Sequence, residues 1–315
     1  MLQPAERQAR QDWRGWFTGV RHGEAIPLSA TRWRDVVISV VIPAHNEAST
    51  IARTLGALNS ESRGSEIDIT LVANGCSDDT VAAARAAFPD IRVVETPIPS
   101  KANALNLGDR HSTGFPRAYL DADIELSPGA LPQMASEMTA CGALAAAPAM
   151  RMRFLDAPWT VRAYYRVWQQ LPYVQEGMIG VGVYMLSETG RARFDQFPDI
   201  IADDGYVRRL FKPHERISVG GCHSTVTAPQ TLWGLVKIKT RSRLGGYELA
   251  RRFPELSENE PKDYRKAIYS LFGAPTIWPA LIVYFGVNFA ARFRARRMLR
   301  QRQFKVWERD DSSRQ

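Results

Sequence analysis

Short apolar runs rich in β-branched residues alternate with helical patterns through the first half of this 315-residue chain. The first run is almost uninterrupted, which is typical of a strand buried on both faces of a parallel sheet. We predict four strands, at Val36–Ile42, Ile67–Ala73, Ile91–Glu95 and Arg117–Leu120. We predict helices between them at Ala48–Leu58, Asp79–Phe88 and Asn103–Leu107. This alternation predicts βαβ units and an α/β fold, and a chain that is 45% apolar can fill its core.

A polar cluster follows each of the four predicted strands. In open α/β sheets, ligands bind beyond the carboxyl ends of the strands. One cluster alone could be a set of helix caps and turns, but four in succession predict a shared binding crevice. The glycine pattern of dinucleotide-binding folds is missing after the first strand. The clusters are Pro43–Glu47, Asn74–Thr80, Ser100–Gly108 and Asp121–Glu125.

Two acidic pairs in the chain could take part in metal binding or catalysis. Asp121 and Asp123 stand two residues apart after a strand, where both carboxylates can converge on one divalent cation. Asp203 and Asp204 precede a predicted helix and could simply complement its N-terminal dipole. Alternatively, Asp204 could act as a general base toward an acceptor hydroxyl. Arg209, about one turn further on, could balance a pyrophosphate or these carboxylates.

The order of these motifs resembles that of the GT-A glycosyltransferases of family 2, over roughly residues 36–250. The family's Pro-x-x-Asn-Glu element is matched by Pro43–Glu47, and its Asp-rich second element is partly matched by Ala73–Thr80. Its Lys-Gly-x-Ala-Leu-Asn-x-Gly element is matched by Lys101–Gly108, with Ala102 in place of glycine. Its Asp-x-Asp corresponds to Asp121 and Asp123, and its Glu-Asp before a Leu-x-x-Arg helix corresponds to Asp203, Asp204 and Arg209.

The resemblance implies a GT-A fold, which is a Rossmann-like, mostly parallel sheet flanked by helices. It also implies a transferase of the hexosyltransferase class that moves one sugar from a nucleotide-sugar to a hydroxyl acceptor, with inversion as the usual outcome. Asp204 would be the general base, and Gly180–Leu186 would form the floor under donor sugar and acceptor. Asp123, with Asp121, would hold Mg or Mn. The implied nucleotide and donor contacts are Pro43, His45, Glu47, Asn74, Asp78, Lys101, Asn106, Asp121 and Arg209.

Two departures from the family pattern limit what the resemblance implies. Ala73 and Asn74 replace paired aspartates, and because an amide offers a different donor and acceptor pattern, the base could be uracil or guanine. Processive synthases of the family carry a Gln-x-x-Arg-Trp motif, whereas Arg243 is followed here by Leu244. We therefore expect a non-processive enzyme. A catalytically silent protein that kept the fold is the alternative, which the retained acidic residues disfavour.

His223 has two interpretations. Some GT-A enzymes place a third metal ligand at about this point of the chain, whereas a lone histidine is more often a structural hydrogen-bonding residue.

The end of the chain combines an uncharged segment with a basic one. Ala267–Ala291 contains no charged residue and is long enough to span a bilayer, but Gly273, Pro275 and Pro279 interrupt it. Residues 292–305 carry seven basic residues and no acidic one, within a chain of net charge +8. A basic run suggests nucleic acid or an anionic membrane. Its position beside an apolar segment favours an inner-leaflet membrane surface and no nucleic-acid partner, with a buried helix hairpin or a dimer interface as the alternative.

These patterns predict an N-terminal arm (1–35), a GT-A domain (36–225), a helical basic acceptor-side region (226–266), membrane-associating helices (267–305) and a tail (306–315). Three distant cysteines and the absence of an apolar leader favour a reducing compartment. We expect a peripheral or monotopic enzyme on the cytoplasmic face of the cell membrane, or alternatively a cytoplasmic one. Its acceptor would be a glycan or a lipid-linked molecule of envelope or exported polysaccharide synthesis.

Overall fold

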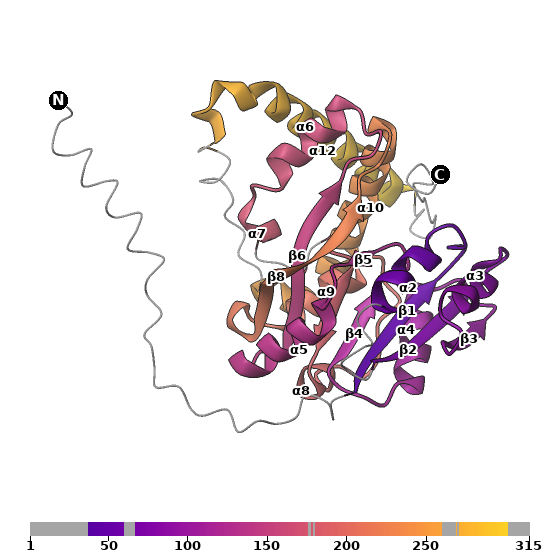
Figure 1. The fold of residues 1–315 in the computed structure, drawn as a ribbon. Helices are drawn as coiled ribbons and strands as arrows, with labels where there is room; N and C mark the ends of the chain where they lie inside the picture. Colours follow the sequence, from indigo (N-terminus) through magenta and orange to yellow (C-terminus); the bar gives the residue numbers. More distant parts are fainter. Residues whose placement is uncertain are drawn as a thin grey trace, which may run out of the picture. The chain divides into compact units, whose positions relative to one another are not determined.

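The computed structural model describes residues 37–59, 67–175, 178, 180–259, 269 and 271–301. Contacts between Cα atoms divide the chain into residues 1–33 and residues 34–315, and all described residues belong to the second unit. The expected N-terminal arm and the C-terminal tail therefore lie outside the described residues. Within the second unit, helices pack on both faces of a single eight-stranded sheet (Figure 1).

The sheet has the strand order β3-β2-β1-β4-β7-β6-β8-β5. The first four strands in this order are mutually parallel, and β7 runs antiparallel to both β4 and β6. β8 pairs parallel with β6 and antiparallel with β5. The sheet is thus mixed but mostly parallel, as predicted. The strands are β1 Ile38–Ala44, β2 Ile67–Asn74, β3 Arg92–Thr96, β4 Arg117–Leu120, β5 Glu125–Leu126, β6 Ala145–Arg153, β7 Val183–Leu186 and β8 Arg216–Thr227.

The first half of the chain forms the predicted elements with small shifts at their ends. The helix predicted at Asn103–Leu107 is longer, because Ser100 caps its N-terminus by accepting a hydrogen bond from the backbone N–H of Asn103 at 3.2 Å. Lys101 is therefore a helical residue and not a loop residue. The α-helices are α2 Ile51–Asn59, α3 Thr80–Ala87, α4 Lys101–His111, α5 Ala130–Cys141, α6 Trp159–Trp168, α7 Pro172–Gln175, α8 Glu188–Arg191, α9 Asp203–Leu210, α10 Leu232–Arg252 and α12 Trp278–Arg300. Short 3-10 helices occupy Pro213–Glu215, Pro254–Asn259 and Pro275–Ile277.

Successive residues of β1 face two different cores. Val40 and Ile42 pack with α2 and α5 on one side of the sheet, and Val41 packs with α4 and α9 on the other. This confirms that the apolar run marks a strand buried on both faces. A third core joins α6, α10 and α12.

Two prolines in the uncharged C-terminal segment begin helices instead of interrupting them. Pro275 opens a 3-10 helix, and Pro279 stands in the first turn of α12, where a missing N–H costs no hydrogen bond. α12 then continues without a break into the basic segment and ends at Arg300. Among the described residues, Pro275–Arg300 is the one helical stretch long and apolar enough to cross a membrane, judged by length and composition.

Candidate active site

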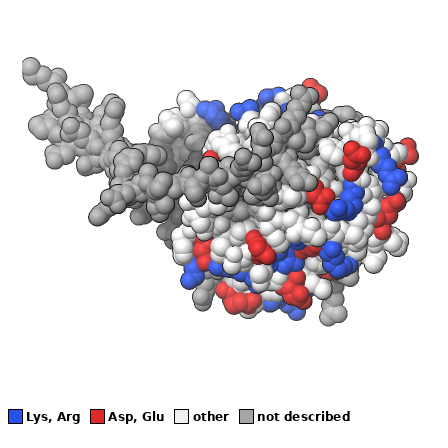
Figure 2. Space-filling view, turned by 60° about the horizontal axis from the view of Figure 1, so that its bottom comes forward, with Lys and Arg blue, Asp and Glu red and all other residues white. Residues whose placement is uncertain are grey.

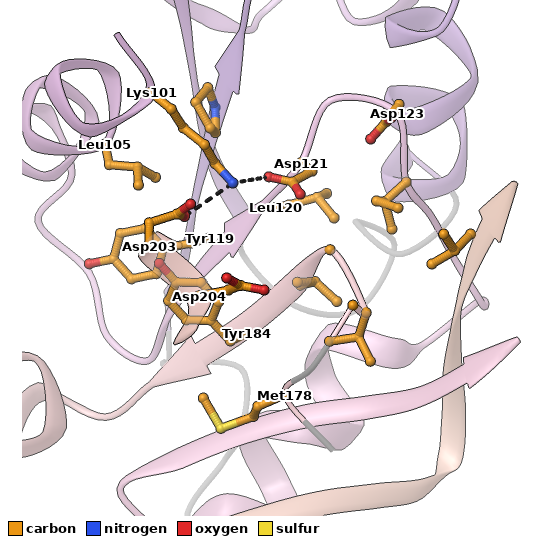
Figure 3. Close-up of a pocket in the computed structure, with 17 residues that line it drawn as sticks. Lys101, Leu105, Tyr119, Leu120, Asp121, Asp123, Met178, Tyr184, Asp203 and Asp204 are labelled. Carbon is orange, nitrogen blue, oxygen red and sulfur yellow. Dashed lines mark ion pairs between the residues drawn. The ribbon is translucent and has the colours of Figure 1, made fainter. Parts of the chain in front are cut away.

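A cavity of about 190 Å³ opens where β4 and β7 meet the first turns of α4 and α9 (Figure 3). Its charged lining brings together residues far apart in the chain: Lys101, Asp121, Asp123, Asp203 and Asp204. Its floor includes Gly180–Tyr184, where the floor under the substrates was predicted. Pro43 lies in the wall, and so do Leu105, Tyr119, Leu120, Ile124, Met178 and Val226.

Lys101 links the acidic residues of two separate elements. Its Nζ lies 2.7 Å from Asp121 Oδ1 and 3.1 Å from Asp203 Oδ2. Figure 3 shows the ammonium group between the two carboxylates. Burial alone would lower the pKa of Lys101, but the negative charges of Asp121, Asp203 and Asp204 outweigh it and raise that pKa above its ordinary value. Lys101 is therefore protonated at neutral pH.

Asp204 has a raised pKa in this cavity. Burial raises the pKa of Asp204 to about 6, and the neighbouring charge of Asp203 adds to the rise. The charge of Lys101 and a hydrogen bond from the backbone N–H of Gly205 oppose it. A carboxyl with this pKa is mostly ionised at neutral pH, yet it is a stronger base than an ordinary aspartate. Asp204 can therefore accept a proton inside the cavity.

Gly182 fixes the backbone beneath Asp121. Its carbonyl accepts a hydrogen bond from the backbone N–H of Asp121 at 2.8 Å, and its φ is +67°. A Cβ at this position would lie 2.3 Å from Cγ1 of Ile124. Only glycine combines this positive φ with the absence of a Cβ. Gly182 therefore lets the cavity floor pack directly against the Asp121–Asp123 turn.

Two tyrosines that sequence reasoning missed form a wall of the cavity. Tyr119 and Tyr184 stack with ring centroids 5.1 Å apart, and Tyr119 donates a hydrogen bond to Asp109 at 2.6 Å. Asp109 also pairs with Arg117 and Arg191. Burial, with Asp203 adding its charge, raises the pKa of Tyr184 well above its ordinary value, so this hydroxyl stays protonated. The alternation of β4 and β7 could have revealed these inward-facing rings, but pairing across strands is not visible in the sequence.

A second group of predicted residues forms a separate cluster at the ends of β1 and β2. The Asp78 carboxylate accepts hydrogen bonds from the backbone N–H groups of Ala48 and Thr80, both at 3.1 Å. Burial works against this carboxylate, but those bonds and one from the Thr80 hydroxyl hold the pKa of Asp78 below its ordinary value. The Asn74 amide donates to the carbonyl of Ala44 at 2.7 Å.

The remaining members of this cluster make similar contacts. The side chain of His45 bonds to the carbonyl of Asn74, and Glu47 is buried with its carboxylate accepting from the Thr50 hydroxyl at 2.8 Å. We call these four residues (His45, Glu47, Asn74 and Asp78) the loop cluster. None of them lines the cavity described above.

The other predicted site residues lie apart from the cavity lining. The Asn106 amide donates to the carbonyl of Phe197 at 3.0 Å and accepts from its N–H at 2.8 Å. It thereby positions the segment that leads to Asp203. Arg209 belongs to the last turn of α9 and is not in the lining. His223 pairs with Ala149 across the sheet, and burial and the charge of Arg151 lower its pKa. Its role as a metal ligand stays a prediction.

The donor set fits a hard divalent cation with two protein ligands. Asp121 and Asp123 supply carboxylate oxygens to the same open cavity, which leaves positions for phosphate oxygens and water. Across the described part of the chain, no group of three or more His, Cys, Asp or Glu residues is arranged to hold a metal. Phosphate oxygens and water would thus supply most of the coordination of the cation.

A larger cavity of about 460 Å³ adjoins the first one at Lys101. Its walls come from the α4 N-terminus, from residues 199–201 and from α10 and α12. Basic side chains dominate the charge of its lining, which includes Lys237, Arg241, Arg252 and Arg294 but only two acidic residues, Asp199 and Glu248. Arg252 is paired with Glu248, at 3.3 Å.

The first part of the described domain matches a known protein family. The model of a family described as Glycosyl transferase family 2 matches residues 39–194, from β1 to just beyond α8. That stretch includes Lys101, Asp121 and Asp123 and stops before Asp203. Comparison with curated protein sequences gave no match.

Solved structures with a similar fold share little sequence with this chain. A mycobacterial protein is 20% identical, with a TM-score of 0.51 over 69% of this chain and 75% of its own. Glucosyl-3-phosphoglycerate synthase from Mycobacterium tuberculosis, in complex with phosphoglyceric acid, is 18% identical, with a TM-score of 0.50 over 73% of this chain and 86% of its own. The same synthase with Mn²⁺, uridine diphosphate and glucosyl-3-phosphoglycerate is 19% identical, with a TM-score of 0.50 over 69% and 80%. These likenesses show the fold.

Proposed function

Given that residues 39–194 form a glycosyl transferase family 2 domain, we propose that this protein transfers one sugar from a nucleotide-sugar to an acceptor hydroxyl. The observation that carries the proposal is the arrangement around Lys101. The partly buried ammonium group of Lys101 lies between a carboxylate after β4 and a carboxylate at the start of α9, with a more basic carboxylate beside it. In the proposed displacement, Asp204 would serve the attacking hydroxyl and Lys101 would serve the leaving diphosphate.

Asp204 is the general base of the proposed reaction. As the acceptor oxygen attacks the anomeric carbon, its proton passes to the Asp204 carboxylate. The new carbon–oxygen bond forms as the bond to the phosphate oxygen breaks, and its electron pair leaves with the nucleoside diphosphate. Direct displacement of this kind inverts the anomeric centre. A pKa of about 6 for Asp204 leaves the base ionised at neutral pH.

Lys101 and the Asp121–Asp123 turn serve the departing diphosphate. The protonated amine of Lys101 can offset charge that develops on the leaving group. A Mg²⁺ or Mn²⁺ ion, when bound by Asp121 and Asp123, would offset the same charge. The loop cluster and Pro43 would shape the nucleotide pocket, and Asn74, which stands where the family has an aspartate, leaves uracil and guanine both open.

The acceptor is proposed to be a glycan or a lipid-linked hydroxyl compound of envelope or exported polysaccharide synthesis, extended by a single sugar. The basic cavity beside Lys101 supports this class, because it is large enough for part of an acceptor and favours anionic groups. A hexose donor is our working assumption.

A ligand screen followed by an assay of turnover tests the proposal. Thermal-shift measurements with nucleoside diphosphates and nucleotide-sugars, with and without Mn²⁺, should show stabilisation by one base, since a ligand that binds the native state raises its stability. The donor identified in this way should be hydrolysed slowly or transferred. Binding to no nucleotide-sugar, with or without the metal, would contradict the proposal.

A further inference from the structure

α12 has two faces of different character. Its inner face packs against α10 and α6 and includes Tyr284, Val287 and Ala291. Its outer face carries large apolar side chains that the described structure leaves exposed. The exposed fractions are 53% for Trp278, 74% for Ile282, 43% for Phe285, 75% for Phe289 and 64% for Phe293.

These five residues recur at intervals of three or four, so they lie in one stripe along the helix. Phe272, 45% exposed, extends the stripe by stacking on Phe285, with ring centroids 6.4 Å apart. We call Phe272 and the five residues the α12 apolar face. Such a contiguous exposed face marks an interaction site more often than an ordinary surface.

Arginines continue the same stripe toward the end of the helix. Arg296 and Arg300 follow Phe293 at the same spacing, and Arg292 and Arg297 flank them. All four are exposed, and α12 contains no acidic residue. The face shown in Figure 2 differs, because acidic and basic residues stand side by side on it. The α12 apolar face and its arginines are therefore complementary to a partner with an apolar interior and an anionic rim.

α12 is held in a way that disfavours crossing a bilayer. Arg243 of α10 donates a hydrogen bond to Asn288 of α12 at 2.6 Å, and the two helices lie side by side (Figure 1). The residues around Arg243 in α10 include Lys237 and Arg241. A spanning α12 would carry these cations into hydrocarbon, which is costly. A helix that lies in the interface buries only its outer face and leaves α10 in water.

We propose that the α12 apolar face docks this protein on the surface of an anionic lipid bilayer. The aromatic and aliphatic side chains enter the boundary between head groups and acyl chains, and the arginines reach the lipid phosphates. A second copy of the chain fits less well, because the face carries no carboxylate to neutralise the arginines. The cytoplasmic leaflet is the anionic one, so this places the protein where nucleotide-sugars are made.

The docked orientation also serves the active site. Arg294 and Met298 of α12 line the basic cavity that adjoins Lys101. A hydroxyl on a lipid head group would thus approach the cavity from the side on which the protein rests.

Vesicle flotation of the full chain tests the proposal. The probes are vesicles of phosphatidylcholine alone and vesicles that also contain phosphatidylglycerol. Wild-type protein should bind the anionic vesicles more tightly, and added salt should weaken binding. Replacing Ile282, Phe289 and Phe293 together by serine should lower the partition coefficient at least about tenfold. Replacing Arg296 and Arg300 by glutamate should lower it by a similar factor and remove the preference for anionic lipid.

Matched controls show whether a loss of vesicle binding reflects lost docking, a folding defect or a general loss of positive charge. Arg85→Glu and Arg110→Glu change exposed arginines of α3 and α4 and should bind like wild type. Circular dichroism and the response to nucleotide should be the same in every variant. Wild-type binding by all the α12 variants would overturn the proposal, as would failure of the wild-type chain to bind anionic vesicles. A dimer that the serine variant abolishes, without vesicle binding, would identify the face as a contact between copies instead.

Discussion

The cavity around Lys101 and the loop cluster at the ends of β1 and β2 use the same types of side chain in opposite ways. In the loop cluster, the Asp78 carboxylate and the Asn74 amide make hydrogen bonds to backbone groups at the ends of β1 and β2. In the cavity, Lys101 pairs with Asp121 and Asp203, and Asp204 lines the open space beside them. One cluster stabilises the shape of the sheet edge, whereas the other keeps its charges available for a ligand.

This difference shows in how the two sets of carboxyls titrate. Burial opposes the charge of Asp78, but hydrogen bonds from the Thr80 hydroxyl and from backbone N–H groups hold its pKa below the ordinary value, so this group is a poor base. Burial among other carboxylates raises the pKa of Asp204 to about 6. From motif position alone, both residues would be interpreted as ligand-binding aspartates. Their different surroundings indicate that Asp78 has a structural role and that Asp204 can act as a base.

Replacing the proposed base should have the largest effect on turnover. Asp204→Asn removes the proton acceptor but keeps the shape of the side chain, so kcat should fall by about a thousandfold. Calorimetric titration should show the donor bound within about threefold of the wild-type affinity, because the contacts that bind the donor in the ground state are unchanged. Turnover close to wild type would remove Asp204 from the mechanism.

Removing the central cation should have the next largest effect. Lys101→Met leaves three carboxylates with no lysine between them, so kcat/KM should fall about a hundredfold. The pH profile supplies a second readout. Wild-type kcat should decline as the pH falls through about 6, where Asp204 gains a proton. Lys101 lowers the pKa of Asp204, so in the variant this decline should move to higher pH; an unmoved profile would exclude the coupling.

Crowding the cavity floor should reduce stability together with activity. Gly182→Ala brings a Cβ within 2.3 Å of Ile124 at a positive φ, which should cost about 2–4 kcal/mol of unfolding free energy. Gly129 has a similar φ of +75° but no atom within 4 Å of its Cβ position. Gly129→Ala should therefore cost only about 1–2 kcal/mol and spare activity. Equal losses in the two variants by urea unfolding would show that crowding is unimportant.

The smallest effect on chemistry should come from the loop cluster. Asp78→Asn leaves a backbone N–H or a hydroxyl without its acceptor, which should cost about 1–3 kcal/mol of stability. The KM for donor should rise, whereas kcat at saturating donor should stay within about twofold. Asp79→Asn is the matched control, because Asp79 makes no side-chain capping bond at the start of α3. A larger loss of kcat than of stability in Asp78→Asn would move the loop cluster into the chemistry.

The sequence predicted the parts of the fold that depend on local pattern. Buried strands such as Ile38–Ala44 and their following helices stand out by periodicity, and Arg117–Leu120 was placed to the residue. β6 and β8 were missed because they lack a comparable apolar signal: β6 mixes alanine with arginine, and β8 contains two glycines and many polar residues. Pro275 and Pro279 suggested breaks, but a proline at the start of a helix is compatible with it.

For the candidate site, the sequence identified residue types but not their partners. Asp121, Asp123 and Asp204 were singled out from position after a strand or before a helix, and the structure places all three in one cavity. The ion pair of Lys101 with Asp203 joins residues about a hundred positions apart, so no spacing rule could show it. Asn106 was expected near the donor, and the structure shows it bonded to the backbone of Phe197.

Single-turnover measurements on Asp204→Asn and Asp78→Asn, side by side at saturating donor, separate the chemistry of the cavity from the structural role of the loop cluster. Release of nucleoside diphosphate should become about a thousandfold slower in Asp204→Asn and stay near the wild-type rate in Asp78→Asn. The reverse order of rates, or equal losses in both variants, would contradict the division between a cavity that does chemistry and a cluster that holds the loops.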